Sequence, residues 1–188
     1  NPIRISVIIV NYNVEYFLEQ CLNSVMKGLE NISGEVYVVD NNSIDGSVEM
    51  VRTKFPEVNL IANKDNRGFS KANNQAMEIA HGDYFLLLNP DTVVEEDTFE
   101  KVVAFMDQHP DGGGLGVRML DGKGKFLPES KRGLPTPTVA FYKIFGLSSI
   151  FPKSKIFGKY HLGYLSEFET NEVEILSGAF MLMRAETI

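Results

Sequence analysis

The sequence is poor in cysteine and in basic residues. Its single cysteine, Cys21, excludes an internal disulfide and a zinc site made of cysteines. Because Cys21 lies at helical spacing from Leu18, Leu22 and Val25, we interpret it as a core residue. The 18 Lys and Arg are outnumbered by 25 Asp and Glu, which gives a formal net charge of −7 and predicts no basic face for nucleic acid. An anionic ligand would therefore be met by a few local cations, backbone amides or a bound metal.

Long apolar runs are also missing. No uninterrupted apolar stretch approaches the roughly 20 residues that a transmembrane helix requires, and no signal peptide precedes Ile3. We therefore expect a soluble, cytoplasmic protein. The 188 residues, 44% of them hydrophobic, predict one domain, residues 1–188, with one core. Because the chain starts without Met and stops at Ile188, just after an apolar strand, we expect a trimmed piece of a longer protein.

Short apolar segments alternate with helical patterns over the first 110 residues. Four segments rich in β-branched or large apolar residues predict buried strands, at residues 5–10, 36–39, 58–61 and 84–88. Apolar residues at three- and four-residue intervals predict helices around residues 17–25, 48–55, 69–80 and 99–106. This order predicts an α/β fold with right-handed crossovers and a mainly parallel sheet flanked by helices.

The regular alternation ends near Asp111. Glycines at 112–114 and prolines at 128, 135 and 137 indicate turns, and residues 173–176 and 179–183 predict strands that return to the core as a small mixed-strand part. The aromatic stretch 139–157 is predicted as a loop or short helices over the sheet. Together with Lys153, Lys155 and Lys159 it is a candidate contact with a lipid-linked acceptor or the inner face of the plasma membrane. A simple loop over an active site is the alternative.

Polar residues follow three of the predicted strands directly. They occupy residues 11–13 (Asn-Tyr-Asn), 40–43 (Asp-Asn-Asn-Ser) and 89–92 (Asn-Pro-Asp-Thr). Ligands of open α/β sheets bind outside the carboxyl ends of the strands, so these clusters predict a binding site. The alternative is that Asn, Asp and Ser only form turns and helix caps.

Two carboxylates stand out in these clusters. The rigid turn 89–92 holds Asp91 with little freedom, which suits an oxygen ligand for Mg²⁺ or Mn²⁺ that also binds a substrate diphosphate. Alternatively, Thr92 and Glu95 form a capping box for the next helix. Asp40 is placed to accept hydrogen bonds from ribose hydroxyls or a base N–H, or else it forms an Asx-turn.

A polar loop at residues 63–68 precedes the third predicted helix. Arg67 is a candidate for contact with a phosphate or a base, although by itself such an arginine is more typical of a solvated surface position. Gly68 permits a positive φ. Asn73 and Asn74 are poor helix formers in the middle of a helix, so at least one of them is expected to face a polar group.

These motifs together resemble family 2 glycosyltransferases with the GT-A fold, a Rossmann-like architecture, and the rhamnosyltransferase-like branch of that family. The resemblance is carried by residues 7–13, 38–47, 66–69 with Asn74, and 88–92, and it continues more weakly at residues 176–180. It implies that residues 1–110 form the nucleotide-sugar-binding half and that residues 111–188 begin the acceptor-side half, which stops short.

The resemblance also implies roles for individual residues. Asp91 matches the last acidic residue of the family's Asp-x-Asp motif, which binds the divalent metal on the donor diphosphate, whereas Asn89 stands at the first acidic position. Ser177 and Gly178 would lie near the donor sugar and acceptor. The residues implied in nucleotide binding are Asn11, Asn13, Asp40, Asn42, Arg67, Gly68, Asn74 and Asn89.

The implied reaction is an inverting transfer in bacterial cell-surface polysaccharide synthesis. An acceptor hydroxyl, on a glycan or a lipid-linked acceptor, attacks the anomeric carbon while the nucleoside diphosphate leaves. A metal stabilises the diphosphate and a carboxylate accepts the proton. In the family that base lies on a helix beyond the strand matching 179–183, so it is expected beyond Ile188. We therefore expect this chain to bind donor and metal but to transfer sugar poorly.

The sequence disfavours two other classes of protein and leaves a third open. A nicotinamide dehydrogenase calls for a glycine-rich turn after its first strand, which residues 11–13 do not provide. A sugar nucleotidyltransferase shares the substrate class and a metal, but no glycine-rich, basic loop follows the first strand to hold a triphosphate. A non-catalytic carbohydrate- or nucleotide-binding module stays open.

Overall fold

The computed structural model describes residues 2–132, 153, 162, 165–173 and 175–188. The chain forms two compact units, one of Asn1–Leu115 with Gly178–Ile188 and one of Gly116–Ser177. The predicted aromatic stretch 139–157 lies outside the described residues apart from Lys153, as do Lys155 and Lys159. No helix within the described ranges is long and apolar enough to cross a membrane.

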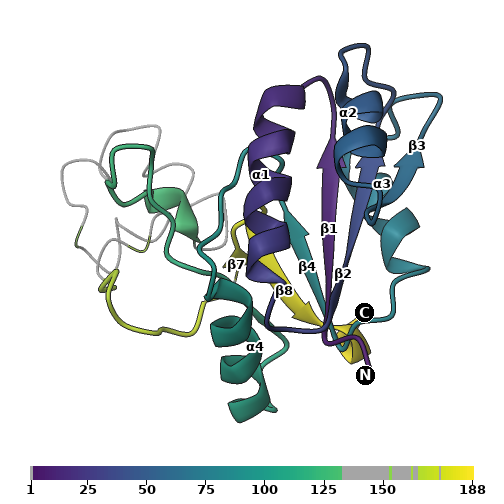
Figure 1. The fold of residues 1–188 in the computed structure, drawn as a ribbon. Helices are drawn as coiled ribbons and strands as arrows, with labels where there is room; N and C mark the ends of the chain where they lie inside the picture. The colour runs from purple at the N-terminus through teal and green to yellow at the C-terminus, as the bar shows by residue number, and fades with distance from the viewer. Residues whose placement is uncertain (1, 133–152, 154–161, 163–164, 174) are drawn as a thin grey trace. The chain divides into compact units, whose positions relative to one another are not determined.

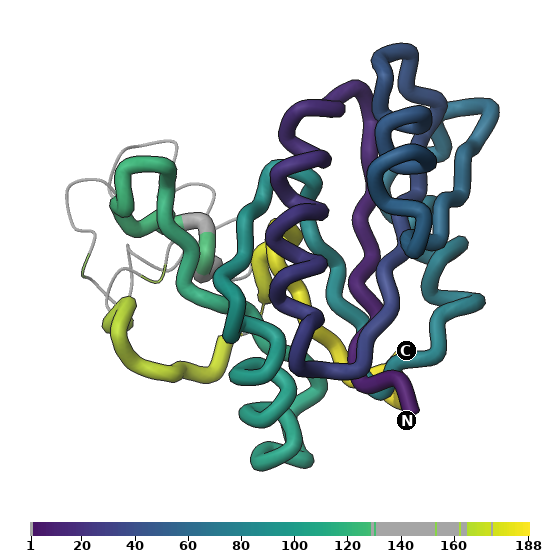
Figure 2. The backbone as a smooth tube through the Cα atoms, in the orientation of Figure 1, coloured from purple at the N-terminus to yellow at the C-terminus, as the bar shows by residue number. Residues whose placement is uncertain are grey.

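The first unit is built on a six-stranded sheet with the order β3-β2-β1-β4-β8-β5. The first four strands along the chain are parallel, and β8 pairs antiparallel with both β4 and β5 (Figures 1 and 2). The predicted mainly parallel α/β sheet is thus confirmed. The strands are β1 (Ile5–Asn11), β2 (Gly34–Asp40), β3 (Asn59–Ala62), β4 (Tyr84–Leu88), β5 (Gly114–Leu115) and β8 (Phe180–Arg184).

Four α-helices of the described chain belong to this unit, and they bury both faces of the sheet. They are α1 (Glu15–Gly28), α2 (Ser47–Lys54), α3 (Phe69–Met77) and α4 (Thr98–Gln108). On one face Ala72 and Ala76 of α3 pack against Ile8, Tyr37 and Phe85. Helix α1 runs alongside β1 in Figure 1, and its buried residues include the predicted core residue Cys21. Burial on both faces explains why these strands are apolar at successive positions rather than alternating.

The third predicted helix is shorter than its sequence pattern. The pattern extends to Ile79 and Ala80, but α3 ends at Met77. The main chain after it is held by other elements: the Tyr37 hydroxyl donates to the Ile79 carbonyl, and the Glu35 carboxylate accepts the His81 N–H. Contacts with β2 therefore end the helix before its apolar periodicity does.

The second unit contains one described strand pair. β6 (Lys131–Arg132) pairs antiparallel with β7 (Ile175–Leu176), and a short 3-10 helix (Pro128–Ser130) precedes β6. The strand predicted at residues 173–176 is thus observed only as Ile175–Leu176, with Glu174 outside the described residues. The strand predicted at 179–183 is β8, shifted by one residue.

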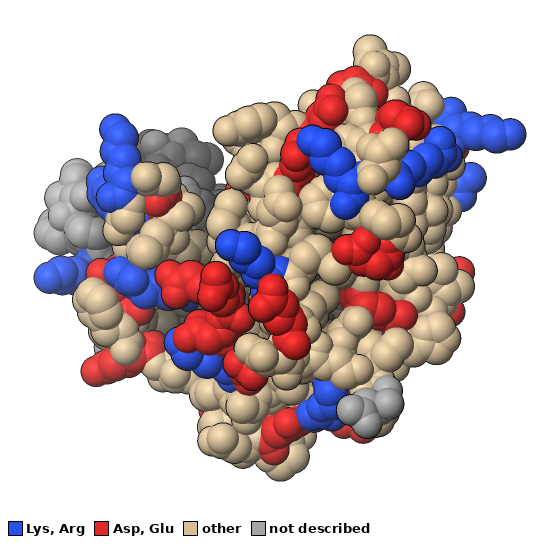
Figure 3. Space-filling model, in the orientation of Figure 1, with Lys and Arg blue, Asp and Glu red and all other residues tan. Residues whose placement is uncertain are grey.

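The described surface carries both signs of charge. Figure 3 shows Lys and Arg interspersed with Asp and Glu, and no continuous basic patch covers the face in view. This distribution agrees with the negative net charge of the sequence.

Candidate functional site

The carboxyl ends of β1, β2 and β4 meet at one edge of the sheet, toward the top of Figure 1. From β1 the chain builds outward to β2 and β3 on one side, and then returns to place β4 on the other side. Such a reversal of strand order opens a crevice at the carboxyl edge, where open α/β sheets bind their ligands. Asn11 ends β1, Asp40 ends β2 and Asn89 follows β4, so the structure brings the three predicted polar clusters to this edge.

A buried hydrogen-bond network joins the ends of β1 and β2. The Asn11 side-chain amide donates to Asp40 Oδ2 over 2.8 Å and to Ser43 Oγ over 3.2 Å. Ser43 in turn donates to both carboxylate oxygens of Asp40, from its N–H over 2.8 Å and from its hydroxyl over 2.7 Å. Asn11 is fully buried and Asp40 is 1% exposed. Asp40 therefore makes the Asx-type turn that the sequence left open as an alternative.

Asn13 and Asn42 shape the two loops above this network. The Asn13 N–H donates to Ser43 Oγ over 2.9 Å, and Asn13 Oδ1 accepts the Ile44 N–H over 2.8 Å. Both asparagines have positive φ, 54° for Asn13 and 66° for Asn42, a conformation that asparagine tolerates better than most residues. The β1–α1 and β2–α2 loops are thereby held together at the rim of the crevice, with both asparagines exposed.

One acceptor in this corner has no partner within the described part of the chain. Asn11 Oδ1 is buried and accepts no hydrogen bond. Rotating the amide would turn that oxygen toward the Asp40 carboxylate, so the observed orientation is the favourable one. A buried acceptor without a donor costs roughly 1–3 kcal/mol, which an N–H group of a ligand can offset.

The loop that carries Arg67 is held by a chain of side-chain amides. Asn41, which is buried, donates to the Gly68 carbonyl over 3.2 Å and accepts from Asn63 over 3.1 Å. Asn63 and Gln75 donate to each other's amide oxygens over 2.9 and 3.1 Å. Gly68 has φ 75°, as its sequence context allowed. Arg67 itself is exposed and pairs with Asp65 over 3.3 Å, so the loop presents a cation to solvent.

The two asparagines of α3 differ in their environment. Asn73 is buried and donates to the Phe69 carbonyl of its own helix over 2.9 Å, whereas Asn74 is exposed. The prediction that at least one of them faces a polar group is confirmed by Asn73, although that group is the helix backbone. Asn74, the residue implied by the resemblance, presents its side chain to solvent.

Asp91 is exposed in a turn directly after β4. The Thr92 N–H donates to the Asn89 carbonyl over 3.1 Å and closes the turn, and the Asn89 N–H donates to the Ala179 carbonyl over 3.0 Å. The capping-box alternative is wrong, because α4 begins at Thr98 and its N-cap is Asp97, not Thr92. The intervening residues instead place Val94 in the core, which separates the turn from the helix.

Cys21 lies beneath this turn. Its thiol approaches the Asn89 carbonyl at 3.7 Å. Burial, and then the negative charge of Asp91, raise the pKa of Cys21 to about 12. The thiol is therefore protonated at neutral pH. The Asp91 carboxylate is close enough for its charge to raise the pKa of this thiol.

The described residues fit a divalent metal only if substrate phosphates and water supply most of its ligands. They contain no group of three or more His, Cys, Asp and Glu side chains placed to hold an ion. Mg²⁺ is nevertheless often bound by one or two carboxylates together with substrate phosphates and water. Asp91, exposed at the strand end, suits that arrangement.

Ser177 and Gly178 fall on the boundary of the two units. Ser177 ends the second unit, and Gly178 opens the segment of the first unit that leads into β8. Gly178 is exposed with no atom within 4 Å of the position a Cβ would take, and its neighbour Ala179 accepts the Asn89 N–H. Gly178 is thereby tied to the same end of β4 as Asp91.

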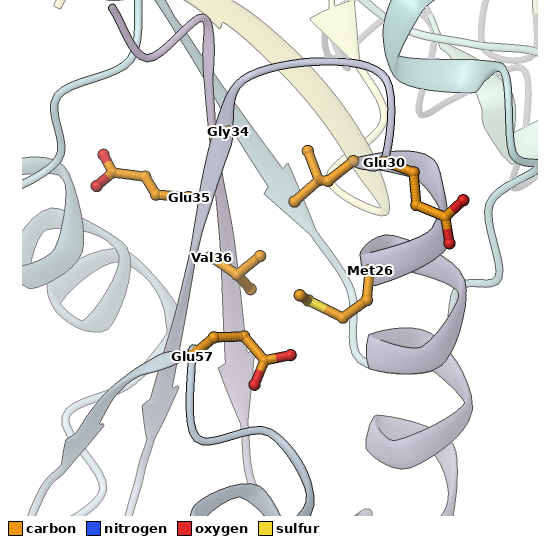
Figure 4. A pocket seen from close by; sticks show the side chains of 7 residues that line it. Met26, Glu30, Gly34, Glu35, Val36 and Glu57 are labelled. Atoms are coloured by element: carbon orange, nitrogen blue, oxygen red, sulfur yellow. The ribbon is translucent and has the colours of Figure 1, made fainter. Parts of the chain in front are cut away.

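A pocket of about 270 Å³ opens at the other end of β2. Figure 4 shows Met26, Glu30 and Glu57 around it, while the Glu35 side chain points away on the opposite side of the strand. It lies at the amino-terminal end of β2, whereas the candidate site is at the carboxyl end beyond Asp40.

Several residues of the candidate site were predicted as part of a polar segment but without a role. Asn41 and Ser43 belong to the predicted cluster 40–43, and Asn63 belongs to the polar loop 63–68. Ser24 and Gln75 occupy ordinary helical positions of α1 and α3 and carried no signal. Only the tertiary partners of these residues show what they hold.

A mainly parallel sheet with polar groups and the exposed Asp91 carboxylate at its switch point is typical of α/β domains that bind a ligand at this edge. Residues 6–186 match the family model described as glycosyl transferase family 2, and the chain belongs to this family. GgaB of Bacillus subtilis, a minor teichoic acid biosynthesis protein, is 37% identical over 110 residues, which are 55% of this chain and 12% of GgaB.

Two further relatives have solved structures. TarS of Staphylococcus aureus, a poly(ribitol-phosphate) β-N-acetylglucosaminyltransferase, is 29% identical over 131 residues, 68% of this chain and 23% of TarS. The structure of its residues 1–349 with UDP-GlcNAc matches with TM-score 0.57 and 25% identity, covering 95% of this chain and 58% of that one. The Pyrobaculum calidifontis mannosyltransferase PcManGT was solved with GDP-Man and Mn²⁺. It matches with TM-score 0.55 and 25% identity, covering 62% of this chain and 37% of that one.

Proposed function

We propose that this chain binds a nucleoside-diphosphate sugar and a divalent metal at the carboxyl edge of β1, β2 and β4, for inverting transfer of the sugar to an acceptor hydroxyl. The proposal rests on the position of the Asn11–Asp40–Ser43 network and the Asp91 turn on either side of the switch point. The family membership supports the reaction class.

The nucleoside is assigned to the β1–β2 side of the crevice. A base N–H would be accepted by Asn11 Oδ1 and by the lone pair of Asp40 that its three internal donors leave over. Asn13, Asn42 and Asn74 are exposed on the surrounding loops and α3, and Arg67 on the amide-held loop supplies a cation toward a phosphate. Gly68 permits that loop's backbone conformation.

The diphosphate and metal are assigned to the β4 side. Asp91 would hold Mg²⁺ or Mn²⁺, which supplies charge stabilisation on the departing diphosphate when bound. Asn89 shapes the turn, and the resemblance assigns Gly178, in the same unit, a place beside the sugar. We assign no catalytic base to a described residue. We expect this chain to bind the donor but to transfer its sugar poorly or not at all.

The relatives indicate the class of donor and acceptor. TarS is named for N-acetylglucosamine transfer to poly(ribitol-phosphate), and PcManGT was solved with GDP-Man. We therefore propose a hexose, N-acetylhexosamine or, from the rhamnosyltransferase-like motifs, a deoxyhexose donor. The acceptor would be a cell-surface glycan or its lipid-linked precursor in bacteria.

Titration of the chain with UDP, GDP and dTDP and their sugar conjugates, with and without Mn²⁺, tests the proposal. We expect at least one diphosphate to bind and Mn²⁺ to tighten it. A preference for nucleoside triphosphates would favour a sugar nucleotidyltransferase, and binding of none of these ligands would overturn the proposal.

Asp91→Asn tests the metal assignment. Because a charge-assisted contact contributes about 1.5–3 kcal/mol, the variant should reduce the tightening by Mn²⁺ by about tenfold or more in calorimetric titrations. Since Asp91 is exposed, the melting temperature should stay within about 2 °C of the wild type. Asp111→Asn, at another exposed aspartate, is the matched control. An unchanged response to Mn²⁺ in Asp91→Asn would show that this carboxylate does not hold the metal.

A further inference from the structure

We infer that Ser24, in the third turn of α1, is a positioning residue that fixes the Asp91 turn for metal binding. The inference rests on the proposed role of Asp91. It concerns a residue to which the proposed function gives no contact with donor or metal, and which acts through the main chain of residues 89–94.

The Ser24 hydroxyl makes two hydrogen bonds with different consequences. It donates to the Cys21 carbonyl over 2.7 Å, within its own helix, and it accepts the Val94 N–H over 3.1 Å. A serine inside a helix often bonds to a carbonyl one turn earlier, so the first bond alone would be a local feature. The second joins α1 to a segment 70 residues away. The first bond directs the only hydroxyl proton toward Cys21, which leaves the lone pairs for Val94.

The segment around Asp91 is anchored at both ends. At its start, the Asn89 N–H donates to Ala179, and the Asn89 carbonyl receives the Thr92 N–H and approaches the Cys21 thiol. At its end, Val94 is 9% exposed and its N–H is held by Ser24. Asp91 lies exposed between the two anchors, in a segment without helix or strand. The main chain at Asp91, from which the carboxylate projects, is therefore placed by the anchors.

A metal site makes this placement consequential. Mg²⁺ demands near-octahedral geometry at about 2.0–2.1 Å, so a ligand must be held within roughly 0.5 Å of its productive position. Ser24→Ala removes the acceptor for the Val94 N–H and loosens one anchor. Because alanine is the best helix former, the substitution does not weaken α1 itself.

The experiment compares nucleotide affinity with Mn²⁺ and with EDTA in four proteins: wild type, Ser24→Ala, Ser24→Thr and Asn23→Ala. The probe is whichever of UDP, GDP or dTDP the wild type binds most tightly. We expect Ser24→Ala to lower the ratio of the affinity with Mn²⁺ to the affinity with EDTA by about three- to tenfold, which corresponds to the loss of one hydrogen bond. Affinity in EDTA should stay within about twofold of the wild type.

The two other variants separate positioning from general stability. Ser24→Thr keeps a hydroxyl at the same position and should restore most of the response to Mn²⁺. Asn23→Ala changes the neighbouring exposed residue of α1 and should match the wild type.

The outcomes distinguish this inference from the proposed function. If the wild type responds to Mn²⁺ and Ser24→Ala responds equally, the positioning role is overturned while the metal assignment stands. If Ser24→Ala weakens binding equally in Mn²⁺ and in EDTA, its role is structural and the inference is also overturned. A wild type that does not respond to Mn²⁺ overturns the metal assignment and the role of Ser24 with it.

Discussion

At the scale of single residues, Glu35 shows how a charge is kept inside the fold away from the site. Its side chain is 12% exposed. The Ser6 hydroxyl and the His81 N–H each donate to Oε1 over 2.6 Å. The Tyr37 hydroxyl, whose one proton is shared with the Ile79 carbonyl, lies 3.1 Å from Oε2. Burial acts to raise the pKa of Glu35, but these donors together hold it below its ordinary value of 4.5. Burial and the Glu35 charge raise the pKa of Tyr37 to about 12.

Glu35→Gln should therefore destabilise the protein in a pH-dependent way. We expect a loss of about 1–2 kcal/mol at pH 7, because Gln keeps the shape but loses the charge that strengthens three hydrogen bonds. Since the folded pKa is depressed, the contribution of the charge is complete above pH 4.5 and is lost as the pH falls through the lower folded value.

Urea denaturation at pH 7 and at about pH 3.5 measures this difference. Glu30→Gln, at an exposed glutamate, is the control and should leave stability unchanged at both values. If the free energies of unfolding of the wild type and of Glu35→Gln differ by the same amount at both pH values, the depressed pKa of Glu35 is contradicted.

At the scale of elements, the connection from α3 to β4 depends on a close approach to β1. Gly82 donates its N–H to Ser6 Oγ over 2.9 Å, and a Cβ at residue 82 would lie 2.6 Å from the Ser6 backbone nitrogen. Backbone cannot withdraw as a flexible side chain can. The glycine is therefore required by the packing between these two elements.

Gly82→Ala should destabilise the protein by about 1–3 kcal/mol, as overpacking of a buried contact does. The urea midpoint measures the change. Gly122→Ala is the matched control, because nothing lies within 4 Å of its Cβ position. Equal stability of the two variants would show that β1 and the loop can separate at little cost.

At the scale of the whole molecule, the sheet of the first unit is completed by the end of the chain. β8 lies between β4 and β5, so residues from 180 onward close a sheet that begins at residue 5. Arg184 at the end of β8 donates to the Tyr84 hydroxyl over 3.2 Å, to the carbonyls of Met106 and His109 over 3.0 and 3.1 Å, and to the Gly112 carbonyl over 3.3 Å. One guanidinium thus ties β8 to β4 and to the end of α4.

Arg184→Lys should lower the free energy of unfolding by about 1–3 kcal/mol, because an ammonium cannot reach four acceptors spread around a planar fork. Thermal and urea unfolding measure the loss. Arg52→Lys, at an exposed position of α2, should be neutral. A neutral Arg184→Lys would mean that β8 is held by its strand pairing alone.

Part of this molecule could be predicted from periodicity alone. The four parallel strands and the helices between them follow from local patterns, because an apolar segment of strand length or a three-to-four spacing defines an element without reference to its partners. The meeting of the polar clusters at residues 11, 40 and 89 was predictable for the same reason, since the parallel order sends their strand ends to one edge.

The sequence by itself determined the class of fold, the edge that carries the candidate site and the turn that presents Asp91. Only the tertiary structure decided that the Asp40 carboxylate accepts hydrogen bonds from Asn11 and Ser43. It also decided that α3 ends at Met77 and that the Ser24 hydroxyl holds the segment beyond Asp91. Apart from the local bond between Asp40 and Ser43, these outcomes depend on hydrogen bonds between residues far apart in the chain. No local pattern records which distant donor will meet which acceptor once the sheet has formed.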